Sequence, residues 1–120
     1  MRPGTRDAAN LHDMLEAARE AHDLVCSTQA DTFLRDRVLQ RALERMLELV
    51  GASAGRVTLK FQASHPEIEW RGIIGQRNIL AHEYGRIKHA LLFQTARENV
   101  PSLMSALEKI LEDRRFTSPR

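Results

Sequence analysis

The stretch FLRDRVLQRALERMLELV, residues 33–50, decides the fold class of this chain. Its apolar residues recur at intervals of three and four, with charged residues between them, which is the pattern of an amphipathic α-helix. The apolar positions are Phe33, Leu34, Val38, Ala42, Leu43, Met46, Leu47 and Val50. Asp31 or Thr32 is placed to cap this helix, and small residues extend it past Gly51 to about Val57.

The same periodicity continues on both sides of this stretch, and no strand pattern of useful length occurs. Further helices are predicted at about residues 7–27, 66–82, 87–99 and 101–113. Pro66 has the φ that is favoured at the first helical position, and Gly85 follows the third helix as a C-terminal signal would. The sequence therefore predicts an all-α fold, a bundle of four or five helices in an up-down arrangement.

Length and charge suit one small domain. With 120 residues, of which 42% are apolar and 28% charged, the chain can form one core but hardly two. We expect a single domain over residues 1–120, with flexible tails at about 1–6 and 115–120. Eighteen Lys and Arg residues against sixteen Asp and Glu give a formal net charge of +2, which does not by itself indicate a nucleic-acid-binding protein.

Cysteine content and hydropathy bear on the compartment. Cys26 is the only cysteine, so neither an intrachain disulfide nor a cysteine-based zinc cluster can form, and we expect its side chain to be buried. No stretch approaches the roughly 20 apolar residues of a membrane span, and the N-terminal residues lack a signal-peptide pattern. These features predict a cytoplasmic protein.

A second stretch, GQRNILAHEYGR at residues 75–86, concentrates reactive side chains near the end of the third predicted helix. Arg77 offers a permanent charge and a fork of donors that match phosphate oxygens. His82 can exchange protons at neutral pH, and the amide of Asn78, four residues earlier, could hold its ring. RNA carries its own nucleophile, the 2′-hydroxyl, so such a cluster could cleave it without a metal.

The same residues also allow a purely structural interpretation. Basic side chains near a helix C-terminus interact favourably with the helix dipole. Tyr84, at a helix end, would then be a half-buried side chain with its hydroxyl in water. The spacing of arginine and histidine alone, R-x4-H, does not decide between the two interpretations.

The string GQRNILAHEY, preceded by HPEIEW, resembles the signature of the HepT toxins of the HEPN superfamily, R-x4–6-H-x-Y, which Arg77, His82 and Tyr84 fill. The resemblance extends over most of the chain. It implies a HEPN-like helical bundle that forms a homodimer, with the motifs of two subunits facing one cleft. It also implies a metal-independent ribonuclease toxin of a type VII-like toxin–antitoxin pair.

The resemblance further implies a role for each motif residue. Arg77 and His82 would be catalytic, and Asn78 would support His82. Tyr84 would accept AMP groups from the partner antitoxin, an MntA-like nucleotidyltransferase, and this modification would block the cleft and neutralise the charge of Arg77. The antitoxin would use ATP for the AMPylation, while the toxin itself would need no cofactor.

Basic residues surround the motif and could bind RNA phosphates. They are Arg71, Arg77, Arg86, Lys88 and His89. A solvated, salt-bridged surface is the alternative interpretation.

The charged positions of the second predicted helix are expected to form a solvated face, or a surface for a dimer or an antitoxin. These positions are Arg35, Asp36, Arg37, Arg41, Glu44, Arg45 and Glu48.

Other functions find less support in the sequence. It has neither the H-E-x-x-H nor the E-x-x-H pattern of a metal site, and it has no glycine-rich phosphate loop. The main competitor to a ribonuclease is a non-catalytic helical protein that lends a nucleotidyltransferase a substrate- or nucleotide-binding surface.

Overall fold

The computed structural model describes residues 4–82 and 87–112. This part of the chain contains seven α-helices and no strand, so the all-α prediction is confirmed, and none of its helices has the length and apolar character needed to cross a membrane. Residues 1–3 and 113–120, which include most of the predicted tails, lie outside the described residues. The helices are α1 (Thr5–Cys26), α2 (Ala30–Arg35), α3 (Arg37–Gly55), α4 (Leu59–Ser64), α5 (Trp70–His82), α6 (His89–Glu98) and α7 (Val100–Glu112).

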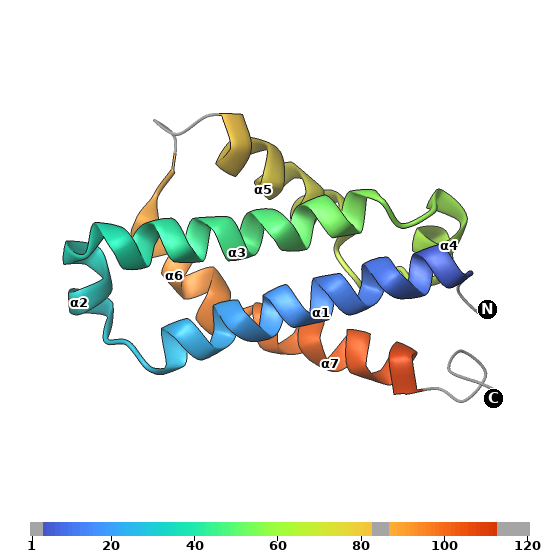
Figure 1. Cartoon of the computed structure of the whole chain (residues 1–120), viewed down its shortest axis with the longest axis horizontal. Coiled ribbons are helices and arrows are strands. Elements are labelled where there is room, and N and C mark those ends of the chain that lie inside the picture. The colour runs from blue at the N-terminus through green and yellow to red at the C-terminus, as the bar shows by residue number, and fades with distance from the viewer. Residues whose placement is uncertain (1–3, 83–86, 113–120) are drawn as a thin grey trace.

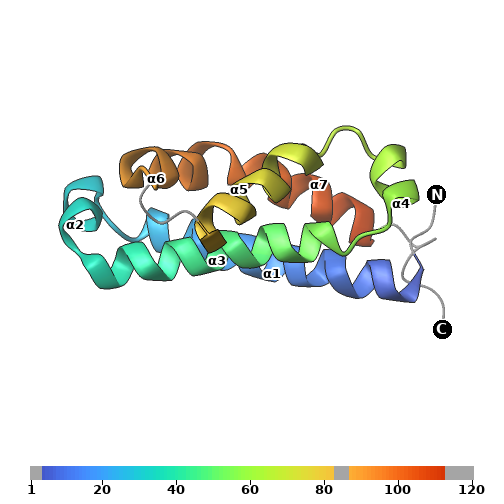
Figure 2. The same ribbon diagram turned by 90° about the horizontal axis from the view of Figure 1, so that it is seen from above.

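The two longest helices, α1 and α3, lie side by side and run antiparallel along the long axis of the molecule (Figure 1). Seen from above, they form one layer, and α6 and α7 form a second layer behind them (Figure 2). α5 packs against α3 along one edge of the molecule. The short helices α2 and α4 lie at opposite ends of the bundle.

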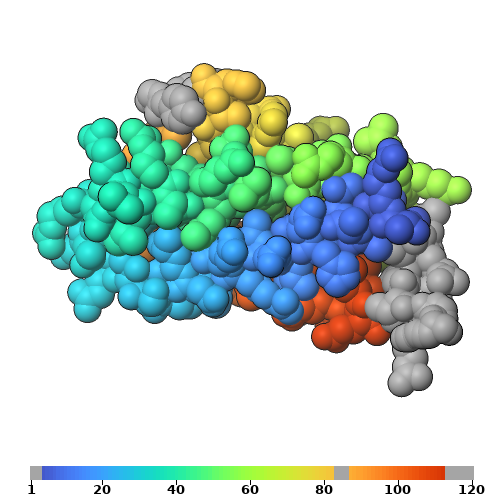
Figure 3. Space-filling model, in the orientation of Figure 1, coloured from blue at the N-terminus to red at the C-terminus, as the bar shows by residue number. Residues whose placement is uncertain are grey.

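The core lies between the two layers. Apolar side chains at three- and four-residue spacing along α1 and α3 meet there, as the sequence pattern predicted. Burial of each large apolar side chain contributes about 1.5–3 kcal/mol to folding. The largest fully buried side chains are Phe33, Phe61, Leu11, Met14, Leu43, Leu107 and Val25. In the space-filling view, the outer side chains of α1 and α3 cover this core across the front of the molecule (Figure 3).

The second predicted helix is divided at Asp36 into α2 and α3. Asp36 has an extended backbone, with φ −119° and ψ 105°, and its carboxylate accepts hydrogen bonds from the N–H groups of Val38 and Leu39 at 2.9 and 3.1 Å. The predicted cap at Asp31 or Thr32 is therefore wrong, because it is Asp36 that satisfies the free N–H groups at the start of a long helix.

Packing accounts for the turn between α2 and α3. It brings Phe33 of α2 against Phe93 of α6, with ring centroids 5.0 Å apart, and Phe33 is fully buried there. The amide of Gln40 donates a hydrogen bond to the Phe33 carbonyl at 3.0 Å. α3 then continues through Gly51 to Gly55, slightly short of the predicted end.

The segment after α3 contains a short helix, α4, where the sequence predicted only a connection. Thr58 caps it by accepting a hydrogen bond from the Phe61 N–H at 3.3 Å. Thr58 also donates its own N–H and hydroxyl to the two carboxylate oxygens of the buried Asp7, at 2.9 and 2.7 Å. This tie joins α4 to the first turn of α1, so a contact between distant segments stabilises the short helix.

The third predicted helix begins at Trp70 and not at Pro66. The His65 carbonyl accepts hydrogen bonds from the Ile68 N–H at 3.2 Å and from the Trp70 indole at 2.9 Å. The Ile68 carbonyl in turn accepts the Trp70 N–H at 2.9 Å. These bonds form a turn that contains Pro66, so the helix starts only after it.

The last two predicted helices are α6 and α7, and their boundary falls at Asn99. Pro101 lies in the first turn of α7, where its missing N–H costs little because that group has no partner inside the helix.

Cys26 is exposed, so the prediction of a buried thiol is wrong. Its sulfur lies 3.3 Å from Nε2 of His22, one turn earlier on α1. Val25 takes the buried position instead. Consecutive helix residues point about 100° apart, and here Val25 faces the core while Cys26 faces away from it.

Candidate active site

α5 carries four of the predicted site residues. The guanidinium-bearing Arg77 is half-buried, whereas Arg71, Asn78 and His82 are exposed. His82 is the last residue of the helix. The sequence prediction of a helix ending at about this position is therefore confirmed.

Residues 83–86 lie outside the described part of the chain. AMP acceptance by Tyr84, RNA binding by Arg86 and the helix-ending role of Gly85 all fall there. Lys88, on the other side of this gap, is exposed and directly precedes the first residue of α6.

Arg77 lies at a close approach between α5 and α3. Gly51 of α3 is buried at this crossing, and a β-carbon added to it would overlap Cβ of Arg77. The added carbon would also lie 2.8 Å from the Ile73 carbonyl oxygen, closer than real β-carbons come. Only glycine permits this approach, so the position of Arg77 depends on a residue of another helix.

The guanidinium of Arg77 has few partners. Nη1 donates a hydrogen bond to Oδ1 of Asn78 at 3.2 Å. Nε is buried and, among the described residues, has no hydrogen-bond partner. Within residues 4–82 and 87–112, no carboxylate forms an ion pair with this side chain, whose β- and γ-carbons pack on α3.

Asn78 has a different partner from the predicted one. It was expected to orient His82, but its Oδ1 accepts the hydrogen bond from Arg77, and no hydrogen bond between described residues joins it to His82. Asn78 and His82 both lie on the exposed side of α5. In this structure the amide therefore supports the arginine.

Arg77 and His82 point in different directions. Five residues along a helix correspond to a rotation of about 140°. Arg77 accordingly packs on α3, while His82 is exposed. The two side chains belong to one short segment but do not share one helix face.

His89 does not join the exposed basic surface around the motif. Its Nε2 lies 2.7 Å from Oε2 of Glu44, and Nη1 of Arg41 lies 3.3 Å from Oε1 of the same carboxylate. Glu44 is only 5% exposed, so its prediction as part of a solvated face is wrong. A buried carboxylate needs such partners because an unpaired buried charge is costly.

Sequence reasoning missed two residues that shape this region. Gly51 lies inside an otherwise strong helix pattern. A glycine in a helix interior often marks close packing, and this signal could have predicted the crossing of α3 and α5. Glu44 carried no local signal, because its partner His89 lies 45 positions away. Within residues 4–82 and 87–112, no group of three His, Cys, Asp or Glu side chains is placed to hold a metal ion.

The described part of the chain is an all-α domain with an Arg-x4-His segment at the end of the helix that crosses α3. A family model described as "HepT-like: Ribonuclease HepT-like" matches residues 14–110, so the chain belongs to the HepT-like ribonuclease family.

Relatives with similar sequences agree with this assignment. The chain is 32% identical to "Probable ribonuclease HepT" of Thermococcus cleftensis over 100 residues, which cover 83% of this chain and 91% of that protein. It is 29% identical to "Putative RNase MJ1380" of Methanocaldococcus jannaschii over 100 residues, which cover 83% and 92% of the two chains. No solved structure gives a significant match.

Proposed function

We propose that this protein is a metal-independent endoribonuclease, the toxin of a type VII-like toxin–antitoxin pair in the cytoplasm, in which Arg77 and His82 are the catalytic residues. The observation that carries the proposal is the placement of Arg77. Its β- and γ-carbons pack against Gly51, its guanidinium donates a hydrogen bond to Asn78, and no described carboxylate forms an ion pair with it. Membership of the HepT-like ribonuclease family supports the same activity.

The proposed reaction needs only groups of the protein and of the RNA, together with solvent water. His82 accepts the proton of a ribose 2′-hydroxyl as this oxygen attacks the adjacent phosphorus. The bond from phosphorus to the 5′-oxygen of the next nucleotide breaks, that oxygen takes a proton from water, and His82 afterwards releases its proton to water. The products are a 2′,3′-cyclic phosphate and a 5′-hydroxyl. Arg77 stabilises the negative charge that develops on the phosphoryl oxygens.

The different directions of Arg77 and His82 favour a site shared between two subunits. One phosphodiester is reached more readily by an arginine of one protomer and a histidine of its partner than by two side chains about 140° apart on one helix. We therefore include a homodimer with one composite cleft in the proposal. Arg71, Lys88 and Arg86 would bind the flanking phosphates of the RNA.

Regulation by a partner completes the proposal. An MntA-like nucleotidyltransferase antitoxin would transfer AMP from ATP to the hydroxyl of Tyr84. The added phosphate would lie close to the chain position of Arg77 and offset its charge, so RNA would bind less well.

The test uses purified protein made without its antitoxin, with Tyr84 confirmed as unmodified by intact mass. It is incubated with end-labelled RNA in excess EDTA, beside folded His82→Ala and His12→Ala variants. His12 is an exposed histidine of α1 and serves as the matched control. We expect cleavage with 2′,3′-cyclic phosphate ends by the wild type and the His12 variant only. No cleavage by the unmodified wild type would refute the proposal and favour a non-catalytic partner of a nucleotidyltransferase.

A further inference from the structure

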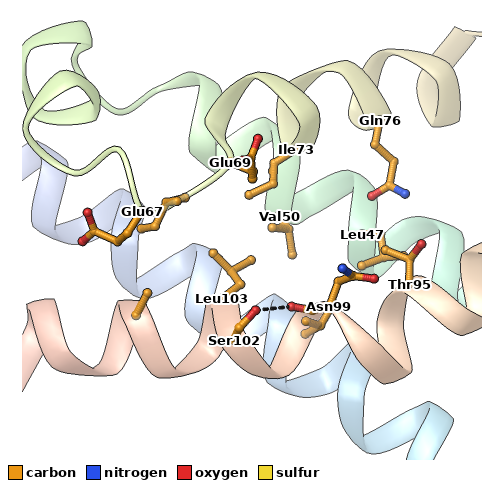
Figure 4. A pocket seen from close by; sticks show the side chains of 13 residues that line it. Leu47, Val50, Glu67, Glu69, Ile73, Gln76, Thr95, Asn99, Ser102 and Leu103 are labelled. Atoms are coloured by element: carbon orange, nitrogen blue, oxygen red, sulfur yellow. Dashed lines mark hydrogen bonds between the residues drawn. The ribbon is translucent and has the colours of Figure 1, made fainter.

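A pocket of about 210 Å³ lies beneath α5, between this helix, α3 and the junction of α6 and α7 (Figure 4). Leu47 and Val50 of α3, Ile73 of α5 and Leu103 of α7 give it apolar walls. Pockets with apolar walls and a few converging polar groups are the usual binding sites for small organic groups.

Three polar side chains gather on one side of this pocket, where Figure 4 shows them close together: Gln76, Thr95 and Asn99. None of the three side chains makes a hydrogen bond to another described residue. Two amides and one hydroxyl offer both donors and acceptors. They can therefore bind the edge of a ring that itself carries donors and acceptors.

The opposite side of the pocket is acidic. Glu67 and Glu69 line it there, and none of the described lining residues is a lysine or an arginine. His65 lies 3.0 Å from Glu67, and this hydrogen bond lowers the pKa of the Glu67 carboxyl below its ordinary value, which keeps it charged. A phosphate would be repelled from this side, whereas an amino group would be attracted.

A smaller cavity of about 190 Å³ continues from the pocket along α6. It shares Gln76 and Thr95 and is also lined by Lys88. The ammonium group of Lys88 can bind a phosphate at a position next to the pocket. The two cavities together thus offer a neutral-to-acidic site for a base and a basic site for the backbone.

We propose that the pocket beneath α5 binds one nucleobase of the RNA substrate, a base with an exocyclic amino group, which Gln76 and Asn99 recognise at its edge. The inference rests on the proposed ribonuclease function. Gln76 directly precedes Arg77 in the chain, so the bound base belongs to a nucleotide close to the scissile phosphate. The pocket thereby sets the sequence preference of cleavage.

Cytidine and uridine are the matched probes, because they differ only at one edge of the base, where cytidine carries an amino group and an acceptor N3 and uridine carries a carbonyl and an N3–H donor. The full-length protein, labelled with ¹⁵N, is titrated with each nucleoside. We expect saturable shifts of the Thr95 and Asn99 backbone amides with cytidine and much smaller shifts with uridine. Gln76→Leu should abolish the response, and Gln94→Leu should keep it, since Gln94 is an exposed amide of α6 that bonds Glu98 and does not line the pocket.

The same variants are then compared for cleavage of RNA libraries. The wild type and Gln94→Leu should prefer one site with an amino-bearing base by about tenfold, as expected for hydrogen-bonded base recognition. Gln76→Leu should cleave with this preference lost. Cleavage without base preference, together with no nucleoside response, would overturn the pocket proposal and leave the ribonuclease function intact. Cytidine binding by a protein that cleaves no RNA would instead overturn the ribonuclease function while supporting the base site.

Discussion

At the scale of single residues, Gly51 determines how closely α5 can pack on α3 and therefore where Arg77 lies. Its lack of a side chain allows α3 to approach Cβ of Arg77 closely, so a residue without a side chain helps to position the arginine. A packing contact of this kind is stiff, because protein interiors have little free space.

The substitution Gly51→Ala tests whether Gly51 positions Arg77. We expect a loss of stability of about 1–3 kcal/mol from overpacking and a fall in kcat for RNA cleavage, since Arg77 must move. Gly55→Ala is the control, because nothing lies within 4 Å of a β-carbon at Gly55 on the same helix. Denaturant melts and cleavage rates under conditions where both variants are folded measure the two effects. Equal rates for the two folded variants would contradict a positioning role of Gly51.

Glu44 and His89 form a second pair that acts at the residue scale. Their 2.7 Å contact attaches the first residue of α6 to α3, directly after the segment that holds Lys88. Arg41 is the remaining described partner of the buried carboxylate, at 3.3 Å.

His89→Ala should lower the free energy of unfolding by about 1–3 kcal/mol, because a buried acceptor loses its strongest hydrogen bond. His12→Ala, at an exposed position without a described hydrogen bond, should leave stability unchanged. Urea denaturation followed by circular dichroism measures the difference. A His89 variant as stable as the His12 variant would show that the contact contributes nothing to the fold.

At the scale of elements, the break between α2 and α3 distinguishes what local sequence shows from what packing requires. Phe33, Val38 and Leu43 fit one continuous helical pattern, and periodicity alone predicts one helix. The structure buries Phe33 against Phe93 and leaves Val38 77% exposed, so the pattern continues through a point where the chain turns. Polar capping by Asp36 makes this turn possible.

Asp36→Ala should destabilise the protein by about 1 kcal/mol, because the first N–H groups of α3 lose their acceptor. Asp31→Ala should have a much smaller effect, since Asp31 is exposed within α2 and does not cap it. Thermal melts of the two variants measure the contrast. A larger loss of stability for Asp31→Ala than for Asp36→Ala would contradict the cap at Asp36 and support a helix that begins at Asp31.

At the scale of the whole molecule, we propose that the activity depends on the association of two protomers. α5 presents His82 to solvent and holds Arg77 against α3, so an isolated protomer offers the two groups in different directions. A symmetric dimer brings the same surface of two protomers together, and each can then complete the other's site.

Two heterodimers with the same number of substitutions test this arrangement. Differently tagged chains are coexpressed and purified as Arg77→Ala paired with His82→Ala, and as wild type paired with a chain carrying both substitutions. If arginine and histidine come from different protomers, the first heterodimer retains one complete site and cleaves RNA, while the second does not. The reverse pattern would place both groups of each site in one protomer.

The sequence by itself determined the helical class, the apolar faces of α1 and α3, and the segment that ends at His82, because neighbouring residues encode periodicity and motif spacing. Local capping chemistry allowed an end or a turn at several positions, and only packing selected among them. The tertiary structure alone decided the crossing at Gly51, the turn at Asp36 and the pair of Glu44 and His89. Each depends on contacts between segments far apart in the chain. The fit of the two helix surfaces sets the distance between the helices, and no pattern of neighbouring residues encodes that distance.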